Sequence, residues 1–295
     1  MDRRNFLKSL ALAGGAAAAA PAIAHEKEAR PESKGMLYDS TRCIGCKACV
    51  VACREANNLP PAQSDGLHDV QQELNGTTKN VIKLYKDPDD PSVFAFMKQQ
   101  CMHCVDPACT SACMLGALKK TAEGPVTYDK SSCIGCRYCQ VACPFNVPKF
   151  EWYTPVPKIV KCELCPERTA QGKLPACVDV CPRQAVIYGT REELLKEAHL
   201  RLEKNPKLYQ PKVYGEHDLG GTNVLYLSAV PFTKLGLPEK GDRSGASVSE
   251  TVQEGVYQSF ITPLVLYGGL AATVFRNWKK GRKNDDEGGE EEEAS

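Results

Sequence analysis

Two stretches of uncharged, mostly apolar residues lie near the two ends of the chain. The longer one covers residues 255–275 and contains 21 residues without a charge. A helix of this length crosses a hydrocarbon layer of about 30 Å, and Pro263 and the Gly268-Gly269 pair are tolerated inside membrane helices. The pattern predicts one C-terminal transmembrane helix over 255–275. A buried core helix or an amphipathic surface helix is the alternative.

A basic cluster follows this stretch at once and predicts its orientation. It comprises Arg276, Lys279, Lys280, Arg282 and Lys283, and an acidic run completes the basic then acidic tail at 276–295. Basic residues beside a membrane helix stay on the cytoplasmic side. The larger part of the chain is therefore expected on the opposite, periplasmic face of the inner (cytoplasmic) membrane.

The shorter apolar stretch, residues 9–20, follows Arg3-Arg4-Asn5-Phe6-Leu7-Lys8 and precedes Ala22-Ile23-Ala24. Paired arginines, an Ala/Gly-rich run and small residues before a cleavage point are typical of a twin-arginine signal peptide. We expect residues 1–24 to direct export by the twin-arginine pathway and 25–35 to form a linker. An ordinary basic amino terminus on a cytoplasmic protein is the alternative.

Between these ends, short apolar segments predict strands rather than long helices. We expect strands near 36–39, 81–85, 93–97, 117–119, 126–129, 185–188 and 223–227, with a hairpin turn at Gly124-Pro125. One helix is clear: Thr190 and Glu193 form a capping box, apolar residues recur at helical spacing, and Asn205-Pro206 ends it. Residues 54–100 are a polar, turn-rich insertion that would contact a partner subunit or form a solvated loop.

Bulk composition narrows the function classes. The chain has 295 residues, 42% of them hydrophobic, and a net charge of +1. This length accommodates about two domain-sized units, and the absence of a basic excess gives no support to nucleic-acid binding. No constellation of catalytic residues, phosphate loop or haem-attachment motif stands out.

The sixteen cysteines fall into four groups of four between positions 43 and 181. These are group one (Cys43, Cys46, Cys49, Cys53), group two (Cys101, Cys104, Cys109, Cys113), group three (Cys133, Cys136, Cys139, Cys143) and group four (Cys162, Cys165, Cys177, Cys181). Groups one and three have the C-x2-C-x2-C-x3-C spacing of bacterial ferredoxins, in which the fourth cysteine ligates a second cluster. Gly45 and Gly135 allow the backbone to turn there with positive φ.

Each [4Fe–4S] cluster takes four thiolates, so sixteen cysteines provide for four [4Fe–4S] clusters with none left over. Disulfides do not require the i, i+3, i+6 triplets, and the paired knuckles of zinc sites suit group four alone. A [2Fe–2S] or [3Fe–4S] centre at one position would leave the function unchanged. Spacing alone does not exclude joining group one with two and three with four.

A Tyr-Asp pair precedes both group one and group three. Each of these groups then contains Cys-Ile-Gly-Cys, a third cysteine and an Ala-Cys pair. This repeat indicates duplication. The expected fold class is α+β: duplicated ferredoxin-like [4Fe–4S] modules with an insertion, followed by one transmembrane helix. The four-cluster domain covers 36–237, and a second linker covers 238–254.

These groups resemble the iron–sulfur subunits of molybdopterin oxidoreductase and membrane hydrogenase complexes. Four segments are similar to the electron-transfer subunit of hydrogenase-2-type uptake [NiFe] hydrogenases: Met36-Leu37-Tyr38-Asp39-Ser40-Thr41, Gln100-Cys101-Met102-His103-Cys104-Val105-Asp106-Pro107, Gly135-Cys136-Arg137-Tyr138-Cys139 and Lys161-Cys162-Glu163-Leu164-Cys165. The resemblance implies four ligand sets: Cys43, Cys46, Cys49 with Cys181; Cys53 with Cys162, Cys165, Cys177; Cys101, Cys104, Cys109 with Cys143; and Cys113 with Cys133, Cys136, Cys139.

The resemblance also implies a non-catalytic electron relay. Its partners would be the small and large subunits of a [NiFe] hydrogenase and an integral membrane quinone-reactive subunit. The iron–sulfur subunit of a formate dehydrogenase or another molybdopterin oxidoreductase is the alternative. Lys47, Arg137 and Lys161 lie next to ligands, where a positive charge would raise cluster potentials, and His103 lies between two ligands.

Overall fold

The computed structural model describes residues 27–61, 73–155, 157–239, 241–242, 244–246 and 266–279. The chain divides into two compact units, His25–Ser249 and a second formed by Met1–Ala24 with Glu250–Ser295. In the second unit residues 266–279 are helical. Within the described ranges no helix combines the length and apolar character needed to span a membrane. The signal peptide, residues 255–265 of the expected transmembrane helix and residues 280–295 of the tail lie outside the described residues.

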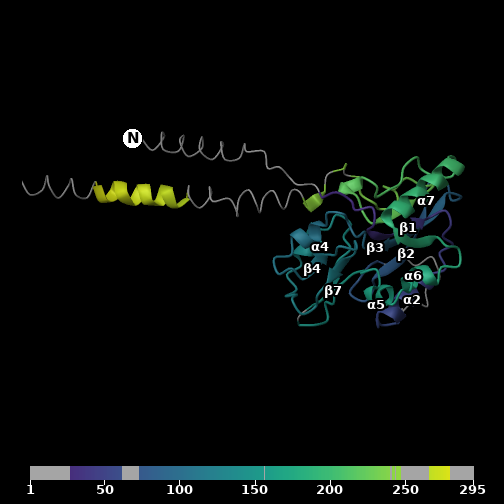
Figure 1. Cartoon of the computed structure of the whole chain (residues 1–295), viewed down its shortest axis with the longest axis horizontal. Coiled ribbons are helices and arrows are strands. Elements are labelled where there is room, and N and C mark those ends of the chain that lie inside the picture. The colour runs from purple at the N-terminus through teal and green to yellow at the C-terminus, as the bar shows by residue number, and fades with distance from the viewer. Residues whose placement is uncertain are drawn as a thin grey trace, which may run out of the picture. The chain divides into compact units, whose positions relative to one another are not determined.

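A three-stranded sheet forms the centre of the larger unit (Figure 1). Strand β1 (Lys34–Asp39) pairs antiparallel with β8 (Val186–Thr190) and parallel with β9 (Val224–Leu227). Alternate residues of β1 point to opposite faces, so Met36 and Tyr38 join the core that contains cysteines, while Leu37 packs on the other side. Both faces are covered, which explains why these strands read as nearly continuous apolar segments.

Helix α7 (Arg191–Lys204) covers one face of this sheet. The capping box that the sequence predicts at its start is present, with the Thr190 side chain and the Glu193 carboxylate satisfying each other's backbone amides. Leu194 and Ala198 pack against Leu225 of the sheet. The helix is fastened at its other end by an ion pair of 3.0 Å between Arg201 and the buried Asp39 of β1.

The insertion contains a β-hairpin that belongs to the core. Strand β2 (Asn80–Lys86) pairs antiparallel with β3 (Phe94–Gln100) along their whole length, close to the strands predicted at 81–85 and 93–97. Val81, Ile82 and Met97 are buried in the same cluster as Met36 and Tyr38. The described part of the insertion is therefore not a solvated loop, because the apolar residues of the hairpin cover one face of the cysteine-containing core.

The cysteine groups form two ferredoxin-like halves. In the first half, α2 (Ala48–Ala56) of group one packs against α6 (Ala176–Asp179) of group four, beside β1 and β8. In the second half, α3 (Ala108–Ser111) of group two packs against α4 (Tyr138–Ala142) of group three, beside the hairpin of β4 (Leu118–Lys120) and β5 (Val126–Tyr128). Figure 1 shows α2, α5 and α6 together, and α4, β4 and β7 together elsewhere in this unit.

Four short elements complete the larger unit. Strands β6 (Lys149–Phe150) and β7 (Ile159–Val160) pair antiparallel and help to close the second half. Helix α5 (Pro166–Ala170) follows the first two cysteines of group four, and the 3-10 turn η1 (Asp218–Gly220) precedes β9. These strands and helices confirm a mixed α/β, ferredoxin-like architecture.

Candidate iron–sulfur sites

Each cysteine group opens with a Cys-x-x-Cys loop that turns in the same way. The residue before the second cysteine has a positive φ in all four loops: +68° at Gly45, +48° at His103, +73° at Gly135 and +61° at Leu164. The sequence predicted this turn only where glycine stands, because non-glycine residues adopt it less readily. At Gly45 a side chain is also excluded by space, since an added Cβ would collide with the Phe96 ring.

Two of these loops already direct backbone amides at sulfur. The N–H of Gly135 donates to Cys133 Sγ at 3.4 Å, and the N–H of Leu164 donates to Cys162 Sγ at 3.5 Å. An amide that points at a thiol stabilises the thiolate form needed for metal binding. In both loops the residue with positive φ is therefore the one whose own N–H donates to the sulfur.

The structure brings the sixteen cysteines together in four sets, judged by which thiols act electrostatically on one another. We name them site A (Cys43, Cys46, Cys49, Cys181), site B (Cys53, Cys162, Cys165, Cys177), site C (Cys101, Cys104, Cys109, Cys143) and site D (Cys113, Cys133, Cys136, Cys139). Group one thus meets group four, and group two meets group three. In each site three cysteines come from one group and one from its partner.

The four sites follow one another in a row. Cys177 of site B interacts with Cys49 of site A, Cys162 of site B with Cys101 of site C, and Cys109 of site C with Cys139 of site D. These pairs of sulfurs, each within electrostatic range of the other, give the order A, B, C, D. The chain order of the groups does not reveal this arrangement, because sites A and B both combine the first and last groups.

The terminal sites are open and the inner ones are enclosed. A cavity with about 370 Å³ of empty space, including its mouth, is lined by all four cysteines of site A. A second, with about 400 Å³, is lined by all four cysteines of site D. Cys46 and Cys136 are exposed at these two sites, whereas Cys53, Cys162 and Cys177 of site B are buried. Donors around a hollow of this kind fit a cluster better than a single ion.

The thiol chemistry also fits a metal cluster. All sixteen cysteines are free thiols. Among the described residues, no three His, Cys, Asp or Glu side chains converge closely enough to hold one metal ion. Burial raises the pKa of Cys53, Cys162 and Cys177 to about 12. Such thiols are protonated at neutral pH, and iron would have to displace their protons on binding.

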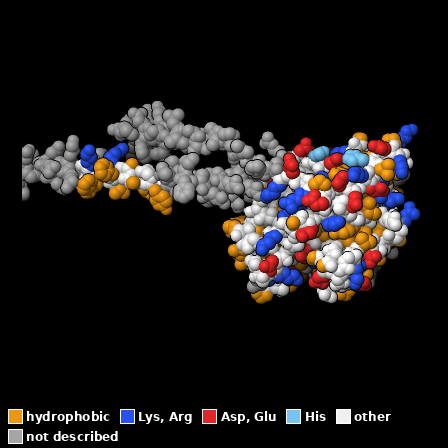
Figure 2. All heavy atoms as spheres, in the orientation of Figure 1, with side chains coloured by type: hydrophobic (Ala, Val, Ile, Leu, Met, Phe, Trp, Pro, Cys, Tyr) orange, Lys and Arg blue, Asp and Glu red, His pale blue; other side chains and the backbone are white. Residues whose placement is uncertain are grey.

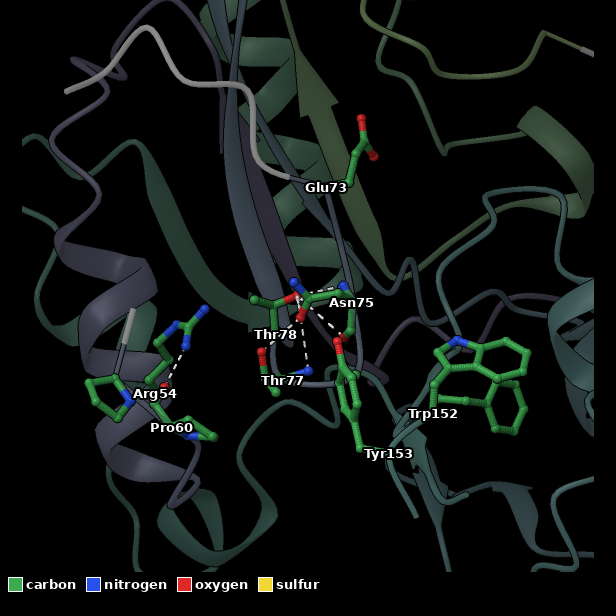
Figure 3. Close-up of a pocket in the computed structure, with 11 residues that line it drawn as sticks. Arg54, Pro60, Glu73, Asn75, Thr77, Thr78, Trp152 and Tyr153 are labelled. Carbon is green, nitrogen blue, oxygen red and sulfur yellow. Dashed lines mark hydrogen bonds between the residues drawn. The ribbon is translucent and has the colours of Figure 1, made fainter. Parts of the chain in front are cut away.

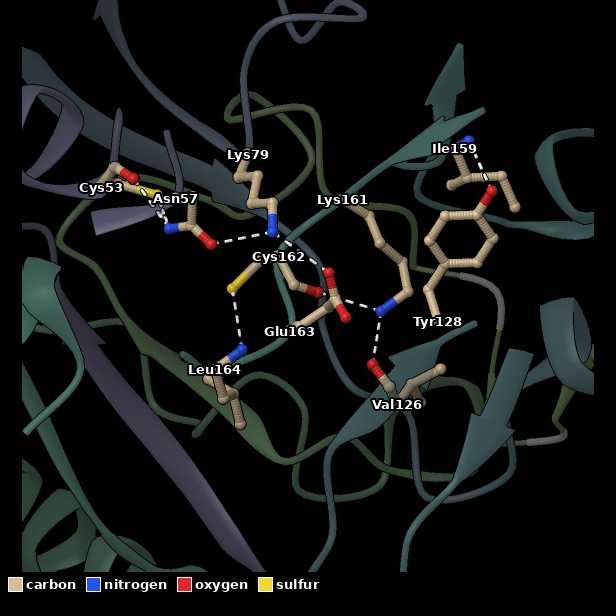
Figure 4. Close-up of polar contacts among 10 residues, drawn as sticks. All are labelled: Cys53, Asn57, Lys79, Val126, Tyr128, Ile159, Lys161, Cys162, Glu163 and Leu164. Atoms are coloured by element: carbon tan, nitrogen blue, oxygen red, sulfur yellow. Dashed lines mark hydrogen bonds and ion pairs between the residues drawn. The ribbon is translucent and has the colours of Figure 1, made fainter. Parts of the chain in front are cut away.

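The buried Lys161 and the half-buried Lys120 lie beside the inner sites. Lys161 precedes Cys162 in the sequence and was expected near a cluster. Its Nζ donates to the Cys162 carbonyl at 3.0 Å and to the Val126 carbonyl (Figure 4). Lys120 Nζ donates to the carbonyls of His103 at 3.0 Å and Cys104 at 2.7 Å, and burial lowers its pKa to about 8. Sequence reasoning missed Lys120 because it lies outside every cysteine motif.

His103 is fully buried at site C. Its Nδ1 accepts a hydrogen bond of 2.9 Å from the Val126 amide, so the neutral ring carries its proton on Nε2. Burial and the nearby Lys161 and Lys120 lower the pKa of His103 and keep the ring neutral. Nε2 has no hydrogen-bond partner among the described residues, which makes it a donor held inside the loop of site C.

Other charged residues beside the cysteines have structural roles. The Arg137 guanidinium lies 4.0 Å from the centroid of the Trp152 ring, a cation–π contact at site D. Lys79 pairs with Glu163 at 3.1 Å and donates to Asn57, whose amide reaches the Cys53 carbonyl at 2.7 Å (Figure 4). This chain of contacts joins the end of α2 to the loop of group four, and so helps to assemble site B.

A further cavity, larger than those at sites A and D, is lined by other residues. It contains about 1280 Å³ of empty space, open solvent included, and is lined by Arg54, Pro60, Asn75, Trp152 and Tyr153 among others (Figure 3). Arg54 donates to the Pro60 carbonyl within it. No cysteine of sites A to D is among its described lining residues.

Comparison with known proteins agrees with this geometry. Residues 92–191 match the family model of the 4Fe-4S dicluster domain. The chain is 40% identical over 334 aligned positions to the hydrogenase-2 operon protein HybA of Escherichia coli O157:H7, with all of both chains covered. The chain belongs to the HybA family of iron–sulfur proteins.

More distant relatives of this HybA-family chain are subunits of another enzyme. The nitrate-inducible formate dehydrogenase iron–sulfur subunit of Escherichia coli K12 is 34% identical, with 80% of each chain covered. The formate dehydrogenase-O iron–sulfur subunit of the same organism is also 34% identical, with 87% of this chain and 86% of the relative covered. HybA thus matches at higher identity and over more of the chain, and the two formate dehydrogenase relatives are named as iron–sulfur subunits.

Proposed function

We propose that this protein relays electrons through four [4Fe–4S] clusters between a [NiFe] hydrogenase and an integral membrane quinone-reactive subunit. The observation that carries the proposal is the row of four cysteine sets, with one exposed cysteine at each terminal site and only buried or half-buried cysteines at the two inner sites. Each bound cluster would supply one-electron redox chemistry. The order A, B, C, D gives electrons a continuous route with one accessible end for each partner.

The residues of the chain hold the route and control its surroundings. The sixteen thiolates fix four cluster positions, and the two cores exclude water from the inner sites. Amides that point at sulfur and buried ammonium groups near the sites favour added negative charge, and both are recognised means of tuning cluster potentials. No described arrangement of residues on this chain suggests catalysis of its own, so hydrogen would be oxidised on the partner.

The proposed location is the periplasmic face of the inner membrane. The twin-arginine pattern, the uncharged residues 255–275 and the basic cluster after them support export and a single C-terminal anchor. The helix at 266–279 exposes apolar side chains, namely Leu266, Tyr267, Leu270, Val274, Phe275 and Trp278. Such a surface is suited to lipid, and Trp278 stands where an interfacial residue is expected.

A partner surface is suggested at site D. Apolar side chains are exposed around its loop and helix, namely Met114, Leu115, Ile134, Tyr138, Val141 and Trp152. Hydrophobic side chains also show at the surface of the larger unit among charged ones (Figure 2). Exposed apolar patches of this kind mark interaction sites, and contact here would exclude water from the terminal cluster.

Hydrogenase is preferred to formate dehydrogenase as the partner because of the similarity to HybA, which extends over the full chain. The test is to solubilise the complex in mild detergent and determine its metals and subunits. Co-purification with a nickel-containing hydrogenase supports the proposal. A molybdenum-containing partner without nickel would establish the alternative.

The cluster content has its own test. The full chain, purified without oxygen, should contain about 16 iron atoms, from four sites of four iron each, and should give EPR signals after dithionite reduction. A colourless protein without iron and labile sulfide would overturn the relay. This result is independent of the partner, so the two parts of the proposal can fail separately.

A further inference from the structure

Lys98 is a fully buried lysine with an unusual environment. It lies on β3 opposite Ile82 of β2, and its side chain has no exposed surface. Its Nζ has no hydrogen-bond partner among the residues that the structure describes. An ammonium group removed from water without a partner is strongly destabilising, so Lys98 keeps its charge only if a negative group lies near it.

The groups that face Lys98 are cysteines of two neighbouring sites. Ile82, which is paired with Lys98 across the hairpin, lines the cavity of site A. Burial alone would lower the pKa of Lys98, but Cys177, Cys49, Cys53 and Cys162, once ionised as they would be when they bind iron, raise it above its ordinary value. Cys49 belongs to site A and the other three belong to site B. The ammonium therefore lies where these two sites meet.

Lys98 differs in this respect from Lys161, the other lysine among the most buried described residues. Lys161 Nζ is engaged by the carbonyls of Val126 and Cys162, which hold its charge against the backbone. The backbone of Lys98 is engaged, since its carbonyl accepts a hydrogen bond of 2.7 Å from the Tyr226 hydroxyl. The strand is thus held at Lys98, while the side-chain ammonium has no hydrogen-bond partner among the described residues.

We propose that Lys98 is a positioning residue for electron transfer, whose ammonium bridges sites A and B and favours reduction of the clusters at both. The inference rests on the proposed electron relay. Reduction adds one electron to a site and neither forms nor breaks a bond, so its main effect on the protein is electrostatic. A fixed positive charge in a low-dielectric interior stabilises that added electron, and between two sites it also weakens the repulsion between electrons held at both.

The test compares Lys98→Met with Lys98→Arg in the full-length holoprotein, purified without oxygen. Methionine retains an unbranched side chain without charge, and arginine retains the charge. Redox titration followed by EPR should show two of four midpoint potentials lowered in Lys98→Met. We expect at least a tenfold change in each one-electron equilibrium, which corresponds to 59 mV. The potentials of sites C and D should stay unchanged. In Lys98→Arg, which keeps the charge, the potentials of sites A and B should stay close to those of the unsubstituted protein.

Lys83→Met is the matched control. Lys83 lies on the neighbouring strand opposite Met97, and its ammonium forms a partly exposed ion pair with Glu73 at 2.5 Å. The same formal charge is removed, but water and the nearby carboxylate screen it. We expect no potential to move. The signals of sites A and D are assigned with Cys46→Ser and Cys136→Ser, which each remove one ligand.

Three results would overturn the role of Lys98. The first is a Lys98→Met protein with about 16 iron atoms and four unchanged potentials. The second is an equal shift of all four potentials. The third is the same loss of iron from Lys98→Met and Lys98→Arg, which would show that packing matters and charge does not. Failure of the relay itself is recognised earlier, because the unsubstituted protein would then lack iron and EPR signals.

Discussion

The two ferredoxin-like halves hold iron with the same motif but are stabilised differently. In the first half, β1 and β8 come from opposite ends of the domain, and β9, the β2–β3 hairpin and α7 enlarge the core around them. In the second half, β4 and β5 are three-residue strands of one local hairpin, supported by the two-residue strands β6 and β7. The first half is built on long-range pairing and the second on local contacts.

Equivalent positions show a difference in exposure as well. Val51 in α2 and Val141 in α4 each stand two residues after the third cysteine of their groups. Val51 is 48% exposed and Val141 is 83% exposed. The duplicated motif thus retains an apolar residue in both halves, but the second half leaves it more open to solvent. We therefore expect the first half to provide most of the stability of the domain and the second half to offer the more exposed apolar surface.

Loss of a ligand should have the largest effect, and its extent should differ between terminal and inner sites. Cys136→Ser removes an exposed ligand of site D, so we expect the loss of roughly four iron atoms with the other EPR signals retained. Cys177→Ser removes a buried ligand of site B, where both halves meet, and should lower the yield of folded protein as well. Iron analysis, EPR and soluble yield measure these effects. Unchanged iron and EPR in Cys136→Ser would contradict the assignment of site D.

The second-largest effect is expected when a buried core residue is truncated. Leu225→Ala empties space between α7 and the sheet of the first half, and Leu118→Ala does so beside the β4–β5 hairpin. Leu→Ala substitutions of buried residues cost about 2–5 kcal/mol. We expect Leu225→Ala at the upper end and Leu118→Ala at the lower end, because the shorter hairpin can relax around the cavity.

The measurement is the midpoint of urea unfolding, followed by circular dichroism on holoprotein kept without oxygen. Cofactor loss makes such unfolding depart from two-state behaviour, so the midpoints are compared at one protein concentration and iron content. Equal midpoints for the two variants would remove the proposed difference in stability between the halves.

A smaller effect is expected at the start of α7, a helix that the second half lacks. Thr190→Ala removes the side-chain oxygen that accepts from the Glu193 amide at 3.3 Å. Loss of such a cap costs about 1 kcal/mol. The same unfolding measurement should therefore show a modest decrease, with Thr190→Ser as the control that retains the cap. A Thr190→Ala protein as stable as Thr190→Ser would show that the capping hydrogen bond contributes nothing.

Much of this fold could be predicted from the sequence, because local patterns determine the strands at 36–39 and 126–129 and the helix after Thr190. The pairing of β1 with β9 was not predictable, since nothing local specifies which distant strand adds to a sheet edge. The left-handed turns at His103 and Leu164 were also missed, because only glycine signals such a turn in a sequence. Lys98 was missed for a related reason: a lysine in a strand ordinarily faces solvent, and only the fold shows that it lies between two cysteine sites.

Val141→Gln is expected to have the smallest effect on stability. It is also the most direct test of the exposed surface at site D. Val141 is largely exposed, and substitutions at such positions change stability by about 0.5 kcal/mol or less. If site D faces a partner, the same substitution places a polar group in an apolar contact and weakens the complex. We expect less hydrogenase to be retained on the tagged full-length chain in mild detergent, with iron content unchanged. Leu200→Gln on the exposed face of α7 is the matched control, and equal retention by both variants would show that the surface around Val141 is not the contact.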